Sequence, residues 1–217
     1  MVPPPARRGR PPVSEERRQQ QRLEISRHAV RLFREQGVAA TSGEQIAKVA
    51  GVSERTLWRH FHTKESCVEP LLTKTIDAFQ DVLRSWPPEL ELAEHLRQAY
   101  TLVPESSQTD VEAVLQIIRM THDEPTLRAL YLVLRERAEP TFVDVLAERL
   151  GAPREALEVR MLAAAVSAAL REATDELVVL TADGVDPDVL AEHRERLADA
   201  LRSITSAPIG PRRQGSR

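Results

Sequence analysis

The segment TSGEQIAKVAGVSERTLWRHFHTKE, residues 41–65, predicts two short helices joined by a tight turn. Ser42 and Gln45, three residues apart, have the spacing of a capping box at the start of the first helix. Gly51 suits the turn, and Ser53 suits the N-cap of the second helix. The segment therefore predicts a helix-turn-helix.

The second helix of this segment has one apolar face and one polar face. Leu57 and Phe61 are four residues apart, so they are expected to point inward together. The side chains left facing outward are polar: Glu54, Arg55, Thr56, Arg59 and His60. A recognition helix needs this distribution, because it packs on one side and reaches DNA on the other. The pattern indicates DNA binding.

The same segment resembles the DNA-binding domain of the TetR family of bacterial transcription regulators. After an upstream Leu32-Phe33 comes the pattern I-A-x-x-A-G-V-S-x-x-T-L-W-R-H-F-x-x-K-E, and the match covers residues 17–70. The resemblance implies an all-α fold, with an N-terminal three-helix DNA-binding domain and a C-terminal helical domain for ligand binding and dimerisation. Two positions depart from the family pattern. Trp58 stands where the family usually has Tyr, and Pro70 falls where the next helix should continue.

Composition and helical periodicity divide the chain into four parts. We expect a disordered basic arm at 1–16, a DNA-binding domain at 17–63, a helical domain at 64–206 and a disordered tail at 207–217. The two ends are rich in Pro, Gly and Arg and have little apolar content to fold.

Helical patterns cover most of the sequence between the two ends, and nothing in it reads as a strand. Outside the helix-turn-helix they are expected at 17–36, 64–85, 89–102, 109–121, 125–150, 153–180 and 187–205. Three prolines carry specific expectations: Pro70 kinks its helix, Pro140 bends the helix at 125–150, and Pro153 opens the helix at 153–180.

Charge is unevenly distributed along the chain. Residues 1–62 carry a net charge of +6 and the remainder carries −9. A basic N-terminal part on an acidic body fits a DNA-binding domain joined to a domain that does not bind DNA. Chance clustering of charge is the alternative. Within the arm, Arg8-Gly9-Arg10-Pro11 resembles the core of an AT-hook, which enters the minor groove of A·T-rich DNA. The alternative is a solvated tail that attracts phosphates without sequence preference.

The side chains expected to contact double-stranded DNA are polar or aromatic and lie in the arm or around the helix-turn-helix: Arg8, Arg10, Thr41, Ser42, Ser53, Arg55, Thr56, Trp58, Arg59, His60 and Lys64. The planar fork of Arg55 matches the O6 and N7 acceptors of guanine. Thr41 and Ser42 precede a helix N-terminus, which suits a phosphate contact. The family resemblance implies that Lys64 touches the DNA backbone.

Two C-terminal helices are candidates for a dimer interface. The run from Met161 to Leu170 is apolar nearly all round, so it is expected to be covered on every side. The last helix carries a seam of Leu190, Leu197, Leu201 and Ile204. Together they suit half of a four-helix bundle across a two-fold axis, and the TetR resemblance implies such a homodimer. A single monomeric core is the alternative.

The resemblance also implies a small-molecule effector in the C-terminal domain. Candidate ligand-binding residues are those that interrupt otherwise apolar helices: His95, Tyr100, Gln116, Arg119, Met120, Tyr131, Arg160 and Arg171. Residues 119–173 are similar to an actinobacterial branch of the family that includes the mycofactocin regulator, which responds to long-chain acyl-CoA. This implies a long apolar effector. The alternative is a C-terminal domain that serves only dimerisation or a protein partner.

Other functional classes find no support in the sequence. There is no G-x-S-x-G, glycine-rich phosphate loop or H-E-x-x-H motif, and Cys67 is the only cysteine. Neither catalysis, a cofactor nor a metal is expected. With no apolar run of membrane-spanning length, a cytoplasmic protein is expected. The sequence thus predicts a DNA-binding transcription regulator, a homodimeric repressor released from a palindromic operator by a small effector.

Overall fold

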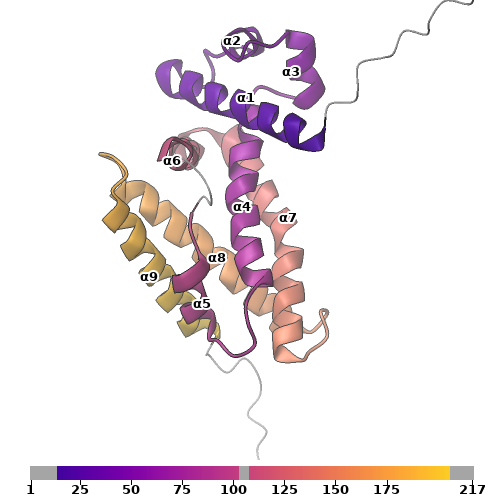
Figure 1. The fold of residues 1–217 in the computed structure, drawn as a ribbon, viewed down its shortest axis with the longest axis vertical. Helices are drawn as coiled ribbons and strands as arrows, with labels where there is room; N and C mark the ends of the chain where they lie inside the picture. Colours follow the sequence, from indigo (N-terminus) through magenta and orange to yellow (C-terminus); the bar gives the residue numbers. More distant parts are fainter. Residues whose placement is uncertain (1–13, 103–107, 206–217) are drawn as a thin grey trace, which may run out of the picture.

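The structure, a computed structural model, describes residues 14–102 and 108–205, and every regular element in these two ranges is helical (Figure 1). The elements in chain order are α1 (Glu15–Gln36), α2 (Gly43–Val49), α3 (Glu54–His60), the 3-10 helix η1 (Glu65–Val68), α4 (Glu69–Arg84), α5 (Leu92–Ala99), α6 (Gln108–Asp123), α7 (Pro125–Leu150), α8 (Leu157–Leu180) and α9 (Pro187–Thr205). The all-α prediction is confirmed.

Helices α1, α2 and α3 form a head at one end of the molecule (Figure 1). The predicted capping box is present, because the Ser42 hydroxyl accepts from the Gln45 N–H and the Gln45 side chain accepts from the Ser42 N–H. The Ser53 hydroxyl caps α3 by accepting from the Thr56 N–H. Gly37 and Gly51 adopt φ values of +84° and +66° at the ends of α1 and α2, a backbone region that favours glycine. The predicted helix-turn-helix is therefore formed by α2 and α3.

Helix α4 connects the head to the body and lies along α7 (Figure 1). The prediction that Pro70 kinks this helix is wrong. The chain first makes the 3-10 turn η1, and α4 begins only at Glu69, whose N–H bonds to the carbonyl of Ser66. Pro70 thus occupies the first turn of α4, where a missing N–H costs no helical hydrogen bond.

The body consists of α4 to α9, with α7 and α8 its longest helices. Gly151 ends α7 in the left-handed conformation, as expected for a C-terminal glycine. Pro140 lies inside α7. The prediction that Pro153 opens the next helix is wrong, because Pro153 starts a turn closed by the Ala156 N–H and α8 begins at Leu157.

Two apolar clusters form the core. One combines the head with the start of α4 and with parts of α6, α7 and α8, and includes Leu57 and Ile117. The other fills the far end of the body between α4, α5, α7, α8 and α9. The seam residues Leu197 and Leu201 are buried in this second cluster, because α5 and α8 cover α9 within the same chain. The expectation that this seam faces a second copy is therefore corrected.

Candidate DNA-binding surface and ligand cavities

Helix α3 presents one face to the head core and the other to solvent. Leu57 and Phe61 are both buried, as predicted from their spacing. Arg55 and Arg59 are exposed, and Trp58 retains 42% of its surface exposure. The Trp58 indole lies so close to Gly43 that a side-chain carbon at that position would overlap the ring. The outward face therefore offers two guanidinium groups and one aromatic edge beside the start of α2.

Some of the hydroxyls that were expected to contact phosphate form hydrogen bonds within the head instead. Thr41 is 2% exposed, and its hydroxyl donates to the Gly37 carbonyl at 2.8 Å and accepts from the Gln36 amide. The hydroxyls of Ser42 and Ser53 accept from the N–H groups that they cap. The structure thus assigns Thr41 to holding the loop between α1 and α2, because its hydroxyl has no free direction towards solvent.

Lys64 also forms its hydrogen bonds within the head. Its ammonium donates to the backbone carbonyls of Val38 at 2.6 Å, Thr41 at 2.8 Å and Ala39 at 3.3 Å. An ammonium has three N–H donors, so all of them are used inside the protein. The contact of Lys64 with the DNA backbone, implied by the family resemblance, would require at least one of these bonds to break.

His60 joins α3 to α1 rather than projecting into solvent. Its Nε2 lies 3.2 Å from the side-chain oxygen of Gln21. Burial and the neighbouring charge of Arg59 lower the pKa of His60, which favours the uncharged ring. Thr56 bonds to the Ser53 hydroxyl at 2.9 Å. Of the expected DNA contacts in the described head, Arg55, Trp58 and Arg59 are the side chains least engaged within the protein.

The two remaining expected contacts, Arg8 and Arg10, lie outside the described residues.

Three charged side chains from three helices meet where the head joins the body. Arg27 of α1 holds both carboxylate oxygens of Asp110 in α6, at 2.6 and 2.9 Å, and Lys74 of α4 approaches one of them at 3.4 Å. Asp110 is 1% exposed. The hydrogen bond from Arg27 lowers the pKa of Asp110, and Lys74 acts in the same direction. We call this group the junction ion cluster.

Sequence reasoning missed the junction ion cluster. Arg27 and Asp110 are 83 positions apart, and neither stands in a motif that would single it out. Arg27 falls beside the apolar stripe of α1, where an arginine reads as an ordinary surface residue.

An aromatic pocket lies in the body between α4, α7 and α8. Phe79 makes edge-to-face contacts with Tyr100 and Phe142, with ring centroids 5.6 and 5.7 Å apart. The remaining lining residues are Thr75, Ile76, Arg135, Ala138, Ser167, Leu170 and Thr174. Its free volume is about 40 Å³, which is room for a water molecule or two and no larger ligand.

Tyr100 is the expected ligand residue that reaches this pocket, and its pKa is raised by burial. Arg135, which sequence reasoning did not select, supplies the only charged group of the lining. Its guanidinium donates to the Tyr131 hydroxyl at 3.1 Å and to the Ser167 carbonyl at 2.6 Å. Tyr131 therefore does not line the pocket itself but holds Arg135, which does.

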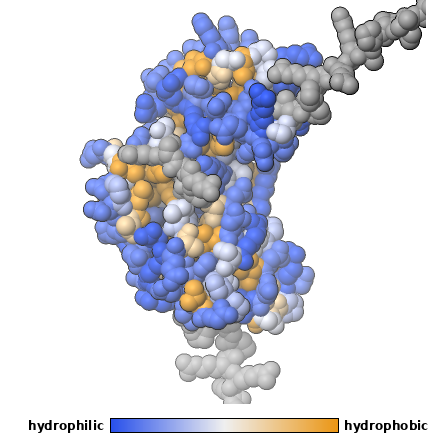
Figure 2. All heavy atoms as spheres, viewed as in Figure 1, coloured by the Kyte–Doolittle hydropathy of each residue, from blue (hydrophilic) through white to orange (hydrophobic). Residues whose placement is uncertain are grey.

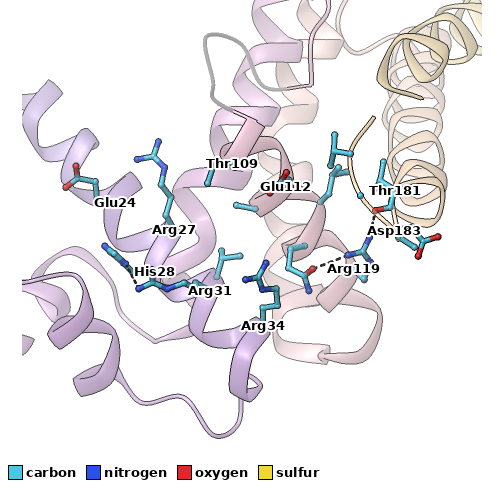
Figure 3. A pocket seen from close by; sticks show the side chains of 17 residues that line it. Glu24, Arg27, His28, Arg31, Arg34, Thr109, Glu112, Arg119, Thr181 and Asp183 are labelled. Atoms are coloured by element: carbon cyan, nitrogen blue, oxygen red, sulfur yellow. Dashed lines mark hydrogen bonds between the residues drawn. The ribbon is translucent and has the colours of Figure 1, made fainter. Parts of the chain in front are cut away.

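A second and larger cavity, of about 580 Å³, lies between α1, α6 and the turn after α8 (Figure 3). Arg27, Arg31 and Arg34 line it from α1, and Gln116 and Arg119 line it from α6. Residues 181–185 close the far side. We call it the junction cavity. It brings together two of the expected ligand residues, Gln116 and Arg119.

The other expected ligand residues lie elsewhere. His95 is buried and holds α5 against the end of α4, with its Nε2 2.8 Å from the Val82 carbonyl. Met120 packs against the first core cluster, and Arg160 is exposed on α8. Arg171 lines a shallow groove between α7 and α8. The structure thus does not gather the expected ligand residues into one site.

A further cavity of about 320 Å³ lies between α5, α6 and α9. Apolar side chains gather in this part of the face shown in Figure 2, where most of the remaining surface is hydrophilic. His193 lines the cavity and is 5% exposed, and its Nε2 has no hydrogen-bond partner among the described residues. Burial lowers the pKa of this imidazole.

Large apolar side chains are exposed along the outer sides of α7 and α8. They are Leu132, Val133, Leu150, Leu157, Met161, Val179 and Leu180. Within the single chain the α8 run from Met161 to Leu170 is not covered on every side, because Met161 keeps 55% of its exposure; coverage of the remaining side by a second copy stays a prediction. An exposed stripe of this kind on two adjacent helices is typical of a surface that is covered by a partner.

Two further findings concern the described part of the chain. None of its helices has both the length and the apolar composition of a membrane-crossing segment. Its His, Cys, Asp and Glu side chains form no group of three or more that could hold a metal ion. Cys67 is buried, and burial raises the pKa of its thiol to about 12, so the thiolate is scarce at neutral pH.

Comparison with known proteins agrees with this geometry. The family model described as "Bacterial regulatory proteins, tetR family" matches residues 25–71. The HTH-type transcriptional regulator TcmR of Streptomyces glaucescens is 29% identical over 136 residues, which is 60% of this chain and 60% of the length of that relative.

Solved structures share the fold over most of the chain. Salmonella enterica GusR has a TM-score of 0.56 and 20% identity, and the match covers 88% of this chain and 95% of that one. A transcriptional regulator of Aquifex aeolicus VF5 has a TM-score of 0.53 and 21% identity, with coverage of 85% and 99%. The multidrug binding protein EbrR, complexed with ethidium, has a TM-score of 0.51 and 22% identity, with coverage of 85% and 98%.

Proposed function

Because this chain belongs to the TetR family of DNA-binding transcription regulators, we propose that it is a homodimeric repressor released from a palindromic operator by a small apolar effector. The observation that carries the proposal is the exposed polar face of α3, in a helix-turn-helix whose other face is packed into the head. That arrangement presents Arg55, Trp58 and Arg59 to a DNA major groove.

Arg55 is our candidate for reading a base, because its guanidinium is exposed at the N-terminal end of α3 and fits guanine O6 and N7. Arg59 and Trp58 are candidates for phosphate contacts. The N-termini of α2 and α3 attract nearby phosphates through their exposed N–H groups and their positive dipole ends. The Ser42 and Ser53 hydroxyls at these N-termini already accept hydrogen bonds as N-caps.

We place the dimer interface on the outer sides of α7 and α8. Leu132 and Met161 belong to the exposed apolar stripe there, and Ala164 and Ala168 lie beside Leu132 along a shallow groove. Small residues allow two helix pairs to approach closely, as in a four-helix bundle formed across a two-fold axis. The leucines of α9 support this interface from within the chain.

We place the effector in the aromatic pocket. The pocket is lined by three aromatic rings and one charged group, Arg135, which suits a mainly apolar ligand such as an acyl chain. EbrR, a protein of the same fold, is complexed with the aromatic molecule ethidium. Since the free volume is about 40 Å³, a ligand would have to spread α4 from α7. Helix α4 would carry this movement to the head, because it lines the pocket at Phe79 and enters the first core cluster at Leu71 and Leu72.

The small volume of the aromatic pocket also supports a second candidate function. If the pocket never opens, the body serves only dimerisation or a protein partner. Fluorescence anisotropy can measure how the chain binds the intergenic DNA beside its own gene, with a scrambled duplex as the control. This measurement distinguishes the two candidate functions. Sequence-dependent binding that palmitoyl-CoA releases supports the repressor with an apolar effector. Sequence-dependent binding that palmitoyl-CoA and palmitate both leave intact argues for the second candidate.

A further inference from the structure

The junction cavity has the volume of a ligand site and is separate from the aromatic pocket. Its volume of about 580 Å³ falls in the range of small-molecule sites in proteins, from about 300 to 1,000 Å³. Its walls belong to both parts of the molecule, with α1 from the head on one side and α6 and residues 181–185 from the body on the other (Figure 3). An occupant would therefore contact head and body at once.

Guanidinium groups without carboxylate partners gather at one end of this cavity. Arg34 forms no ion pair with any residue in the described ranges, and Arg31 bonds only to the ring Nδ1 of His28, at 3.2 Å. Burial and the charge of Arg31 both lower the pKa of His28, so an uncharged ring accepts this bond and leaves the positive charge of Arg31 uncompensated. Neither Arg31 nor Arg34 therefore has a carboxylate within ion-pair distance among the described residues.

Arg119 approaches the same end from α6. It donates to the Gln116 side chain at 3.0 Å and to the Val178 and Thr181 carbonyls at 3.0 and 3.3 Å, all of which are uncharged acceptors. These bonds fix the guanidinium in place without neutralising it. Figure 3 shows Arg34 reaching from α1 towards the α6 wall that carries Arg119.

Carboxylates line the cavity as well. Glu24 lies near the middle of α1, about two turns before Arg31 and nearly three turns before Arg34. Arg27, between them, is already paired with Asp110. Glu112 and Asp183 also line the cavity, and neither forms an ion pair with a described residue. Oxyanion-binding groups and apolar lining side chains, such as Val30 and Leu115, thus occur together.

We propose that the junction cavity binds an organic anion, with its carboxylate or phosphate held by Arg34 and Arg119 and its apolar part against Val30 and Leu115. Guanidinium groups bind both kinds of oxyanion through paired N–H donors, so the shared chemistry is an oxyanion on an apolar body. The site differs from the aromatic pocket in position and in charge, and its ligand would set the angle between α1 and the body.

A pair of fluorescent probes tests the proposal without DNA. The first, 8-anilinonaphthalene-1-sulfonate, carries an anionic group on an aromatic body, and the second, N-phenyl-1-naphthylamine, has the same body without the charge. Titration of the full chain with each probe separates recognition of the anion from general apolar binding. Arg34→Gln is the test variant because Arg34 is exposed and bonds to nothing in the described chain, so folding should be retained. Arg17→Gln is the control, as Arg17 is an exposed arginine of the same helix outside the cavity.

We expect Arg34→Gln to weaken binding of the sulfonate about five- to tenfold, as for loss of one charge-assisted bond. Arg34→Glu should weaken it further, and neither variant should alter binding of the uncharged probe. Displacement of the sulfonate by pyrophosphate or by citrate then distinguishes a phosphate ligand from a carboxylate ligand. Equal sulfonate binding by the parent chain, Arg34→Gln and Arg34→Glu would overturn the proposal, as would an equal loss for both probes. These outcomes are independent of whether the chain binds operator DNA.

Discussion

Arg55 is the side chain on which sequence-specific recognition should depend most. Arg55→Ala is expected to cost about 1–3 kcal/mol at one base position, because a bidentate contact to guanine is lost. Competition binding with operator duplexes altered at single positions measures this. The variant should lose discrimination at one position per half-site and keep it elsewhere. An equal loss on operator and scrambled DNA would remove the base-reading role.

Lys64 should act on the stability of the head. Lys64→Ala removes the donor shared by three loop carbonyls and is expected to lower the free energy of unfolding by about 1–3 kcal/mol. Thermal unfolding followed by circular dichroism measures the effect. The matched control is Lys48→Ala, at an exposed lysine of α2. If Lys64→Ala weakened DNA binding while leaving thermal stability unchanged, Lys64 would be a phosphate contact, as the family resemblance implies.

His193 should make the stability of the body depend on pH. Its pKa in the folded protein is lowered, chiefly by burial, below the value of about 6.5 expected in the unfolded chain. As the pH falls below about 6.5, the unfolded chain takes up a proton that the folded chain does not, so the free energy of unfolding decreases. His193→Leu should flatten the pH dependence of chemical denaturation between about pH 7.5 and 5.5. An unchanged slope would show that His193 is protonated equally in both states.

At the scale of elements, local signals predicted the end of α1, both ends of α2 and the start of α3 well. Helix α1 itself begins at Glu15, with Ser14 as its N-cap, and so includes the last two residues of the arm expected at 1–16. Capping boxes, N-caps and terminal glycines act within four residues, so the sequence contains both partners of each interaction. The start of α4 was mispredicted because the helical pattern from Thr63 onward suits a 3-10 turn as well as an α-helix. The choice between them depends on the bonds of η1 and on packing against α1.

Pro70 of α4 and Pro140 of α7 give a direct test of this placement. Pro70→Ala should change the free energy of unfolding by less than about 1 kcal/mol, since Pro70 occupies a first turn. Pro140→Ala should stabilise the protein by about 1–3 kcal/mol, because Pro140 interrupts the interior of α7. Urea denaturation of both variants provides the comparison. Stabilisation by Pro70→Ala as large as that by Pro140→Ala would mean that α4 begins earlier than Glu69.

The junction ion cluster joins α1, α4 and α6, and no local signal predicts it, because its partners meet only after the head has docked on the body. Arg27→Gln should lower the free energy of unfolding by about 1–3 kcal/mol, discounted for the partial exposure of Arg27. The double variant with Asp110→Asn should lose less than the sum of the two single variants. Strict additivity in chemical denaturation would show that the pair contributes no coupling.

At the scale of the whole molecule, composition and charge predicted a basic head on an acidic body. They did not predict which helices face a partner. The seam of α9 has the spacing of an interface but is buried by α5 and α8 within one chain, whereas α7 and α8 leave apolar side chains exposed. A spacing pattern shows that a helix face is buried without showing what covers it. The domain boundary at residues 63 and 64 likewise stays a prediction.

The oligomeric state tests the assignment of the exposed stripe. Leu132→Glu should convert a dimer to a monomer, because a buried carboxylate without a partner is costly at an interface. Size-exclusion chromatography with light scattering measures this. Val49→Glu, at an exposed apolar residue of α2, is the control and should remain dimeric. A dimer that tolerates Leu132→Glu would place the interface elsewhere.

We propose above that α3 reads a specific DNA sequence as part of a two-fold symmetric dimer. Selection of duplexes from a random pool by the full chain, followed by sequencing, tests it most directly. The structure and the family assignment predict enrichment of one palindromic motif, with two half-sites centred on the same helical face of the DNA. Arg55→Ala should relax that motif at one position in each half-site. A pool that stays random after repeated rounds at low salt would contradict the claim.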